Sequence, residues 1–327
     1  MELRGDVGCP EDDDVDRVVL HAPGLELSGL LATPRTSPRA LVLALHGGGM
    51  TSGYFHGRAH PDLSLLRLGQ HLGFSVLALD RPGYGRSRAA LPDGLSLREQ
   101  ALTVLHALDA FASTHDTGAG VFVVGHSYGL KLALHLAAHP RGKMFLGLDG
   151  SGAAYRYPPE LAPDSTARER DADHHRSSSG QASRRRQLFW GAEALYPPAT
   201  FDPGMRPVAT MPLAESRESA RWTEELPGLA ARVRVPYQFT VAEHERWWQV
   251  TDEALAEYRA LFTAAPSVTF HRQPAAGHNI SLSWAARPYH LRALAFAEQC
   301  LPRPTSRAGR RRTRSSPGGR PEDRGQG

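Results

Sequence analysis

A serine stands between two glycines at the point where an apolar run gives way to a helix-like one. Residues 121–129 read VFVVGHSYG, and LKLALHLAAH follows directly. The first run is typical of a strand, and Leu and Ala at helical spacing are typical of a helix. A tight reversal between a strand and a helix leaves no room for side chains beside the serine, which explains the glycines. The pattern predicts that the hydroxyl of Ser127 is presented at a sheet edge as a nucleophile.

A serine hydroxyl needs a base to take its proton, and the base needs an acid to fix its tautomer. His278 lies in AAGHNIS, just after the last predicted strand, and is the expected base. The acid is expected after the preceding strand, where the chain reads FTVAEHERWW. Glu245 is preferred there and Glu243 is the alternative in the same turn. Asp149 is a third candidate, because it ends another strand at the same edge.

Glycines also follow another apolar run, in LVLALHGGGMTSGYF at 41–55. Three glycines after a buried strand expose backbone N–H groups, and such groups stabilise the negative charge that develops on an attacked carbonyl. The N–H of Tyr128, directly after the serine, is the expected second donor. A phosphate-binding loop is the other interpretation, but no G-K-[ST] follows and no nucleotide fingerprint is completed. We therefore expect no cofactor.

The composition is that of a globular protein with a sizeable core, because 41% of the 327 residues are hydrophobic and 22% are charged. No apolar run approaches the roughly 18 residues of a membrane span. The chain begins MELRGDVGCPEDDDVD, acidic where a signal peptide would be basic and then apolar. We therefore expect a cytoplasmic protein without a membrane partner. Cys9 and Cys300 form no CxxC pair and are expected to be ordinary thiols, with no metal site.

The net charge of +4 is unevenly distributed along the chain. Residues 303–327 hold eight arginines and two acidic residues. The net positive charge of this tail is larger than the +4 of the whole chain, so the rest of the chain is slightly acidic. This tail consists of Arg, Pro, Gly, Ser and Thr with almost no apolar residue, and such a composition predicts disorder. We expect no specific nucleic-acid partner.

Short apolar segments alternate with longer amphipathic ones, which predicts an α/β fold with a mostly parallel eight-stranded sheet flanked by helices. The first two strands are separated only by APG and are expected to form a hairpin, whereas crossovers link those that follow. Strands are predicted at 15–22, 25–33, 40–46, 74–80, 120–125, 144–149, 236–242 and 268–273. Helices are predicted at 63–72, 96–114, 129–139, 251–264 and 286–301.

The alternation stops between residues 154 and 232, where Pro-rich and basic stretches surround the aromatic segment QLFWGAEALYPPATF. We interpret 154–232 as a cap or lid inserted into a core formed by 15–153 and 233–301. The alternative is a plain surface excursion. Residues 1–14 are expected to form a disordered acidic leader, and 302–327 the disordered Arg-rich tail.

Taken together, HGGG at 46–49, LDRPGYGRS at 79–87, GHSYG at 125–129, AEHE at 242–245 and GHN at 277–279 resemble the α/β-hydrolase superfamily in order and spacing. The resemblance implies Ser127 as nucleophile, His278 as base, an acid after the penultimate strand, and an oxyanion hole formed by the N–H groups of Gly48 and Tyr128. The sequence departs from the usual pattern at Glu245, where members commonly have Asp, and at Ala242, where they often have Gly.

The nucleophile indicates the class of reaction. Epoxide and haloalkane hydrolysis on such folds use an aspartate, so Ser127 favours hydrolysis of a small-molecule ester or thioester through an acyl-enzyme. An acyltransferase or cyclase using the same intermediate, or a non-catalytic binding protein on the same fold, are the alternatives. Aromatic residues expected near the site favour a hydrophobic substrate. The alternative for each of them is a place in the hydrophobic core. These residues are Tyr54, Phe55, Phe189, Trp190, Trp247 and Trp248.

Overall fold

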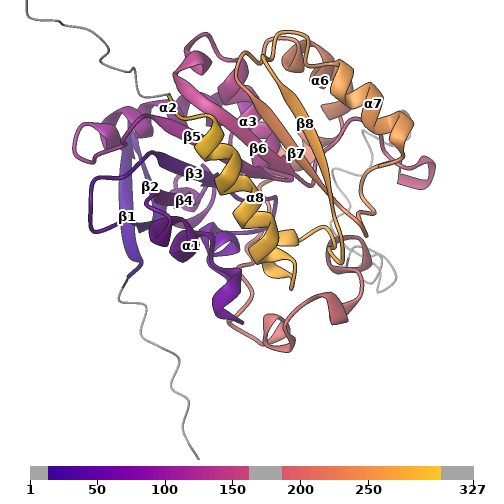
Figure 1. Ribbon diagram of the computed structural model, residues 1–327, viewed down its shortest axis with the longest axis horizontal. Helices are drawn as coiled ribbons and strands as arrows, with labels where there is room; N and C mark the ends of the chain where they lie inside the picture. The colour runs from indigo at the N-terminus through magenta and orange to yellow at the C-terminus, as the bar shows by residue number, and fades with distance from the viewer. Residues whose placement is uncertain (1–13, 162–185, 303–327) are drawn as a thin grey trace, which may run out of the picture.

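The computed structural model describes residues 14–161 and 186–302, and its centre is one eight-stranded sheet (Figure 1). The strand order is β1-β2-β4-β3-β5-β6-β7-β8. β3 to β8 run parallel, whereas β1 and β2 form the predicted antiparallel hairpin and β2 also pairs antiparallel with β4. The predicted fold class is thereby confirmed. The strands are β1 (Asp16–Ala22), β2 (Leu25–Ala32), β3 (Leu41–Leu45), β4 (Ser75–Leu79), β5 (Val121–His126), β6 (Phe145–Ser151), β7 (Tyr237–Ala242) and β8 (Val268–Gln273).

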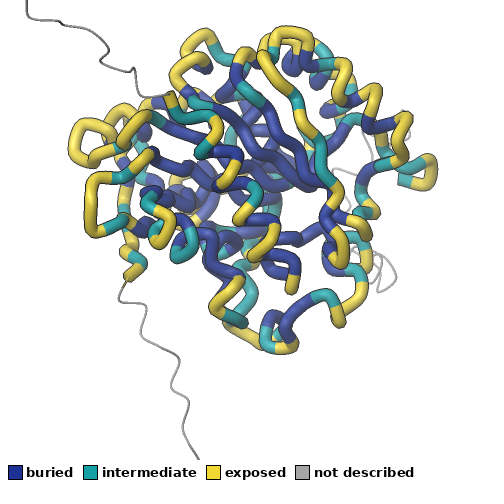
Figure 2. The backbone as a smooth tube through the Cα atoms, in the orientation of Figure 1, coloured by how far each residue is buried: buried dark blue, intermediate teal, exposed yellow. Residues whose placement is uncertain are grey.

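The central strands are buried along their whole length, because helices cover both faces of the sheet (Figure 2). In β3, Leu43 belongs to a core on the side of α2, α3, α6 and α7, while Val42 and Ala44 belong to a second core with α1 and α8. This alternation follows from the two-residue period of a strand. The helices are α1 (Leu65–His71), α2 (Leu97–Ala112), α3 (Tyr128–Ala138), α5 (Leu213–Ser219), α6 (Trp222–Ala230), α7 (Asp252–Ala260) and α8 (Ala286–Gln299).

Helix starts follow local sequence signals. Ser96 caps α2 by accepting from the N–H of Glu99, whose carboxylate in turn accepts from the N–H of Ser96, which is a capping box. Thr251 caps α7 through the N–H of Ala254. The predicted helices therefore start within two residues of the observed ones, although α7 ends at 260 rather than 264.

The described parts of the 154–232 segment, 154–161 and 186–232, contain α5 and α6, which the sequence pattern did not predict. This segment touches the glycine-rich loop after β3, because the N–H of Thr51 donates to the carbonyl oxygen of Pro207 and the N–H of Ala209 donates to that of Gly49. Its designation as a cap remains an interpretation.

Most of the predicted leader and tail falls outside the described residues. No helix within 14–161 and 186–302 is both long enough and apolar enough to span a membrane.

Candidate active site

Ser127 occupies the sharp turn between β5 and α3. Its φ of 53° and ψ of −117° lie outside the regions that non-glycine residues prefer. Such a conformation costs about 1–3 kcal/mol and persists only where the surroundings enforce it. Here the N–H of Ser127 donates to the carbonyl oxygen of Ser151 over 2.8 Å, and its own carbonyl accepts from the N–H of Leu130 over 3.0 Å. The Ser127 hydroxyl makes no capping hydrogen bond to the first turn of α3.

The two glycines around this serine are required by close backbone approaches. A Cβ on Gly125 would lie 2.7 Å from the Cα of Leu130, and one on Gly129 would lie 2.0 Å from the carbonyl oxygen of Leu45. Both distances are far below van der Waals contact. The glycines thus allow β3, β5 and α3 to meet at the serine, as the sequence pattern predicts.

Three side chains from separate strand ends form a continuous hydrogen-bond chain. Ser127 Oγ lies 3.2 Å from His278 Nε2, and His278 Nδ1 lies 2.8 Å from Glu245 Oε2 and 3.1 Å from Oε1. The side chains of His278 and Glu245 are only 2% and 4% exposed. An Nδ1–H that donates to the carboxylate leaves Nε2 free to accept the serine proton. The arrangement is chemically suited to activating the serine oxygen.

The turn after β7 fixes the carboxylate of Glu245. Its Oε1 accepts from the backbone N–H of Arg246 over 2.9 Å and from that of Trp247 over 2.8 Å. These donors orient the carboxylate toward the imidazole of His278, where a glutamate, although longer than aspartate, still reaches. The Glu245 position is thus compatible with the role of the acid.

The other two candidate acids lie elsewhere. Glu243 is exposed, and its carboxylate accepts from the N–H of Ala275 over 2.7 Å. Asp149 is fully buried within β6, where its carboxylate accepts from Gln238 Nε2 over 2.7 Å and from the hydroxyl of Tyr289 over 2.9 Å. Burial raises the pKa of Asp149 to about 7. Neither carboxylate bonds to His278, because the turn directs Glu243 outward and β6 directs Asp149 into the protein.

Backbone N–H groups adjoin the serine from two directions. Gly48 and Tyr128 both line a cavity of about 230 Å³ that opens beside Ser127 and His278. Tyr128 begins α3, and N–H groups in a first helical turn have no partner within the helix. Gly48 lies in the glycine-rich loop, where an added Cβ would lie 3.0 Å from Met211 Sδ. The two positions are compatible with the predicted oxyanion hole.

A buried ion pair holds the glycine-rich loop in place. Arg81, just after β4, donates from Nε to the carbonyl oxygen of His46 over 2.7 Å and from Nη2 to that of Gly47 over 3.3 Å. Its guanidinium also pairs with both carboxylate oxygens of Glu215 in α5, and neither side chain is exposed. Tyr84 donates to the same carboxylate and accepts from the N–H of Gly49. The loop is therefore tied to the 154–232 segment.

Aromatic side chains form much of the cavity wall. Phe189, Trp247 and Trp248, all predicted to bind substrate, line it. The remaining lining residues are Gly48, Ser127, Tyr128, Lys131, Tyr157, Met211, Ser216, Ser219 and His278.

The other three aromatic residues predicted to bind substrate are not among the residues that line this cavity. Tyr54 and Phe55 are fully buried, and Tyr54 stacks on His126 with ring centroids 4.5 Å apart. The chain after the glycines turns back into the protein as a short 3-10 helix, which takes both rings into the core. Trp190 packs edge-on against Tyr196 and Phe201 instead.

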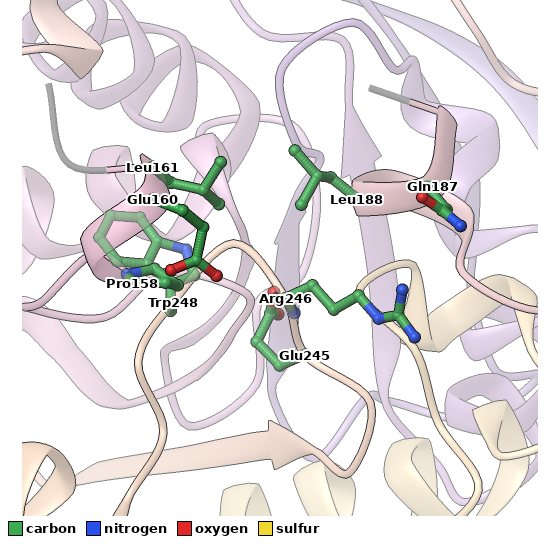
Figure 3. Close-up of a pocket in the computed structure, with 8 residues that line it drawn as sticks. All are labelled: Pro158, Glu160, Leu161, Gln187, Leu188, Glu245, Arg246 and Trp248. Carbon is green, nitrogen blue, oxygen red and sulfur yellow. Dashed lines mark hydrogen bonds between the residues drawn. The ribbon is translucent and has the colours of Figure 1, made fainter. Parts of the chain in front are cut away.

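A second hollow, of about 450 Å³, lies beside the turn after β7 that contains Glu245 (Figure 3). Glu245 and Arg246 lie between its two sides, with Glu160 and Trp248 on one and Leu188 on the other. Trp248 lines both this hollow and the cavity at Ser127. The two spaces therefore share Trp248 as a wall residue.

Three residues of the site were not predicted from the sequence: Lys131, Arg81 and Glu215. Lys131 is a single lysine within the apolar helix LKLALHLAAH, and that isolation was an available signal. Arg81 lies within the motif LDRPGYGRS, but its partner Glu215 lies in a helix that was not predicted. Pairing over 134 positions has no local signature.

Comparison with known proteins agrees with this fold. Residues 41–293 match the family model described as the alpha/beta hydrolase family, so the chain belongs to that family. A search of curated protein sequences found no match.

Solved structures share the fold at low identity. A thermostable carboxyl esterase from Bacillus coagulans aligns with a TM-score of 0.64 and 16% identity, over 88% of this chain and 99% of the other. A thermophilic esterase from Thermogutta terrifontis aligns with a TM-score of 0.58 and 18% identity, over 88% and 100%. The epoxide hydrolase VrEH1 from Vigna radiata aligns with a TM-score of 0.57 and 15% identity, over 88% and 99%. At these identities the similarity establishes the fold alone.

Proposed function

We propose that this protein is a serine hydrolase that cleaves a carboxylic ester or thioester of a hydrophobic small molecule through an acyl-enzyme on Ser127. The observation that carries the proposal is the hydrogen-bond chain from Ser127 through His278 to Glu245, which ends at a cavity. Such a chain serves nucleophilic acyl transfer on many unrelated folds.

In the proposed reaction, Ser127 Oγ attacks the substrate carbonyl while His278 Nε2 takes the hydroxyl proton. The N–H groups of Gly48 and Tyr128 donate to the resulting oxyanion, and one such donor is typically worth about 3 kcal/mol of barrier. As the intermediate collapses, His278 protonates the leaving alcohol or thiol. Water then attacks the acyl-enzyme with the same histidine as base, which releases the acid and restores Ser127.

Ester cleavage is favoured over epoxide opening, although the structural neighbours include proteins described as epoxide hydrolases. Epoxide opening on this fold uses a carboxylate nucleophile, and the nucleophile position here holds Ser127. The aromatic wall formed by Phe189, Trp247 and Trp248 favours an apolar portion of the substrate.

Turnover of methyl, ethyl and 4-nitrophenyl esters, together with acyl thioesters, tests the proposal. Wild-type protein is expected to hydrolyse at least one of these series, and Ser127→Ala is expected to lose that activity while keeping the circular dichroism spectrum of the folded protein. Equal activity of the two proteins would contradict the proposal, as would the absence of ester and thioester turnover by the folded wild type.

A further inference from the structure

A buried lysine lies in the wall of the cavity that contains the serine. Lys131 lies in the first turn of α3, and its backbone N–H donates to the carbonyl oxygen of Ser127, the residue before the helix, over 3.3 Å. Lys131 is only 4% exposed and lines the cavity together with Ser127 and His278. Lysine is rarely buried to this extent unless a partner compensates its charge.

The ammonium of Lys131 has few partners among the residues that the structure describes. Within these it makes one hydrogen bond, to Ser219 Oγ at 3.4 Å, and it lies 5.1–5.7 Å from the ring centroids of Tyr128, Trp222 and Trp248. Among residues 14–161 and 186–302, no carboxylate lies within ion-pair distance of it. An ammonium has three donors, so hydrogen-bonding capacity is left for a ligand.

The nearby acidic side chains have other partners. Glu218 accepts from the hydroxyl of Tyr128 and from the N–H of Leu97, each over 2.8 Å. Glu215 is paired with Arg81, and Glu225 lies 3.5 Å from a nitrogen of Arg221. Burial lowers the pKa of Lys131 to about 7, while the charges of Glu215, Glu218 and Glu225 oppose that shift. None of these three carboxylates lines the cavity in the part of the chain that the structure describes.

The cavity wall therefore offers a cation and hydroxyl donors to whatever enters it. Ser216 and Ser219 line it beside Lys131, and no acidic side chain does so in the described ranges. A carboxylate is the group that best matches a desolvated ammonium with adjacent hydroxyls, because charge-assisted hydrogen bonds are stronger than neutral ones. Lysine is rare in this chain, which has two lysines among its 38 lysine and arginine residues.

We propose that Lys131 determines substrate specificity by binding a carboxylate on the acyl group, so that the preferred substrates are monoesters or monothioesters of dicarboxylic acids. This proposal rests on the proposed acyl chemistry at Ser127. The aromatic walls then hold the methylene chain between the scissile carbonyl and the carboxylate, and the ammonium of Lys131 fixes its far end.

Paired methyl esters of one dicarboxylic acid test this directly. Monomethyl and dimethyl esters of the acids from succinic to suberic differ only in whether the far end is a carboxylate or a neutral ester. For the acid of best-fitting length, kcat/KM of wild-type protein is expected to favour the monomethyl ester by about tenfold to a hundredfold, the usual worth of a charge-assisted hydrogen bond. Lys131→Met is expected to abolish that preference. Lys143→Met, the same change at the exposed second lysine, is expected to retain it.

Two further measurements keep the result interpretable. Reaction with a fluorophosphonate counts correctly folded sites in each variant, so a misfolded Lys131→Met is recognised. Calorimetric binding of both esters to Ser127→Ala compares them without turnover, and the monomethyl ester is expected to bind more tightly. Ser127-dependent hydrolysis without a monomethyl preference at any chain length would overturn the role of Lys131 but leave the hydrolase proposal intact. If the folded wild-type protein shows no Ser127-dependent hydrolysis, the hydrolase proposal is overturned instead. In that case, equal binding of the two esters to Ser127→Ala would overturn the carboxylate site as well.

Discussion

Arg81 and Glu215 form an ion pair from which solvent is fully excluded, and both carboxylate oxygens take part in it. The pair joins the turn after β4 to α5, and Arg81 also donates to the carbonyl oxygens of His46 and Gly47 at the start of the glycine-rich loop. The position of one predicted oxyanion donor, the N–H of Gly48, therefore depends on an interaction with the 154–232 segment.

Glu215→Gln is expected to destabilise the fold strongly. It leaves the charge of Arg81 buried without compensation, and breaking a buried pair from one side typically costs about 3–5 kcal/mol. Glu257→Gln is the matched control, because Glu257 pairs with Arg156 where both side chains are about half exposed, and such exposed pairs contribute little to stability. Urea unfolding gives both free energies. Similar decreases in the free energy of unfolding of the two variants would contradict the expected larger contribution of the buried pair.

Glu245→Gln is expected to lower kcat by about a thousandfold to ten-thousandfold, because an amide no longer stabilises the imidazolium of His278 or fixes its tautomer. Glu243→Gln is the neighbouring control and is expected to change kcat by no more than a few fold, since its carboxylate contacts the N–H of Ala275 and not His278. Steady-state kinetics on the best ester measures both. A larger loss from Glu243→Gln would assign the acid to that residue instead.

Gly129→Ala is expected to disrupt folding, because its new methyl group would lie 2.0 Å from a backbone oxygen of Leu45. Overpacking of this kind usually costs about 1–3 kcal/mol and occasionally more, and a backbone neighbour cannot rotate away. Gly228→Ala in α6 is the control, since the nearest atom to a Cβ there is Arg232 Nη1 at 3.9 Å. Alanine in a helix interior is expected to stabilise the protein by about 0.5–1 kcal/mol. Thermal unfolding that ranks the two variants the other way would refute the packing argument.

The preference for a carboxylate ester is expected to depend on pH. Burial lowers the pKa of Lys131 to about 7, so its ammonium is present below that pH and is lost above it. The ratio of kcat/KM for the monomethyl and dimethyl esters should thus be constant below pH 7 and fall by up to about tenfold per unit above it. Using a ratio cancels every effect of pH that is common to the two esters. A ratio that is flat or rising from pH 6 to 9 would be incompatible with binding by a protonated Lys131.

Much of the fold could be predicted because its signals are local. Apolar runs such as SVLAL at β4 and capping residues such as Ser96 depend on neighbours in the sequence, and the predicted strands match the observed ones closely. The glycines around Ser127 were equally informative, since their absence of a side chain has a direct steric cause.

Other features could not be predicted because they depend on distant parts of the chain. Nothing near Arg81 indicates that its partner is Glu215, and nothing near Tyr54 indicates that the ring stacks on His126 rather than lining the cavity. An aromatic residue after a glycine-rich loop has the same local pattern in either place. The roles of Ser127, His278 and Glu245 remain predictions that kinetics must test.

The most direct test of a nucleophilic Ser127 is the mass of the intact protein after reaction with a fluorophosphonate. The wild-type protein is expected to gain the mass of one phosphonyl group, located by peptide mapping on Ser127, whereas Ser127→Ala is expected to gain none. Absence of an adduct on folded wild-type protein, or equal labelling of Ser127→Ala, would contradict the account.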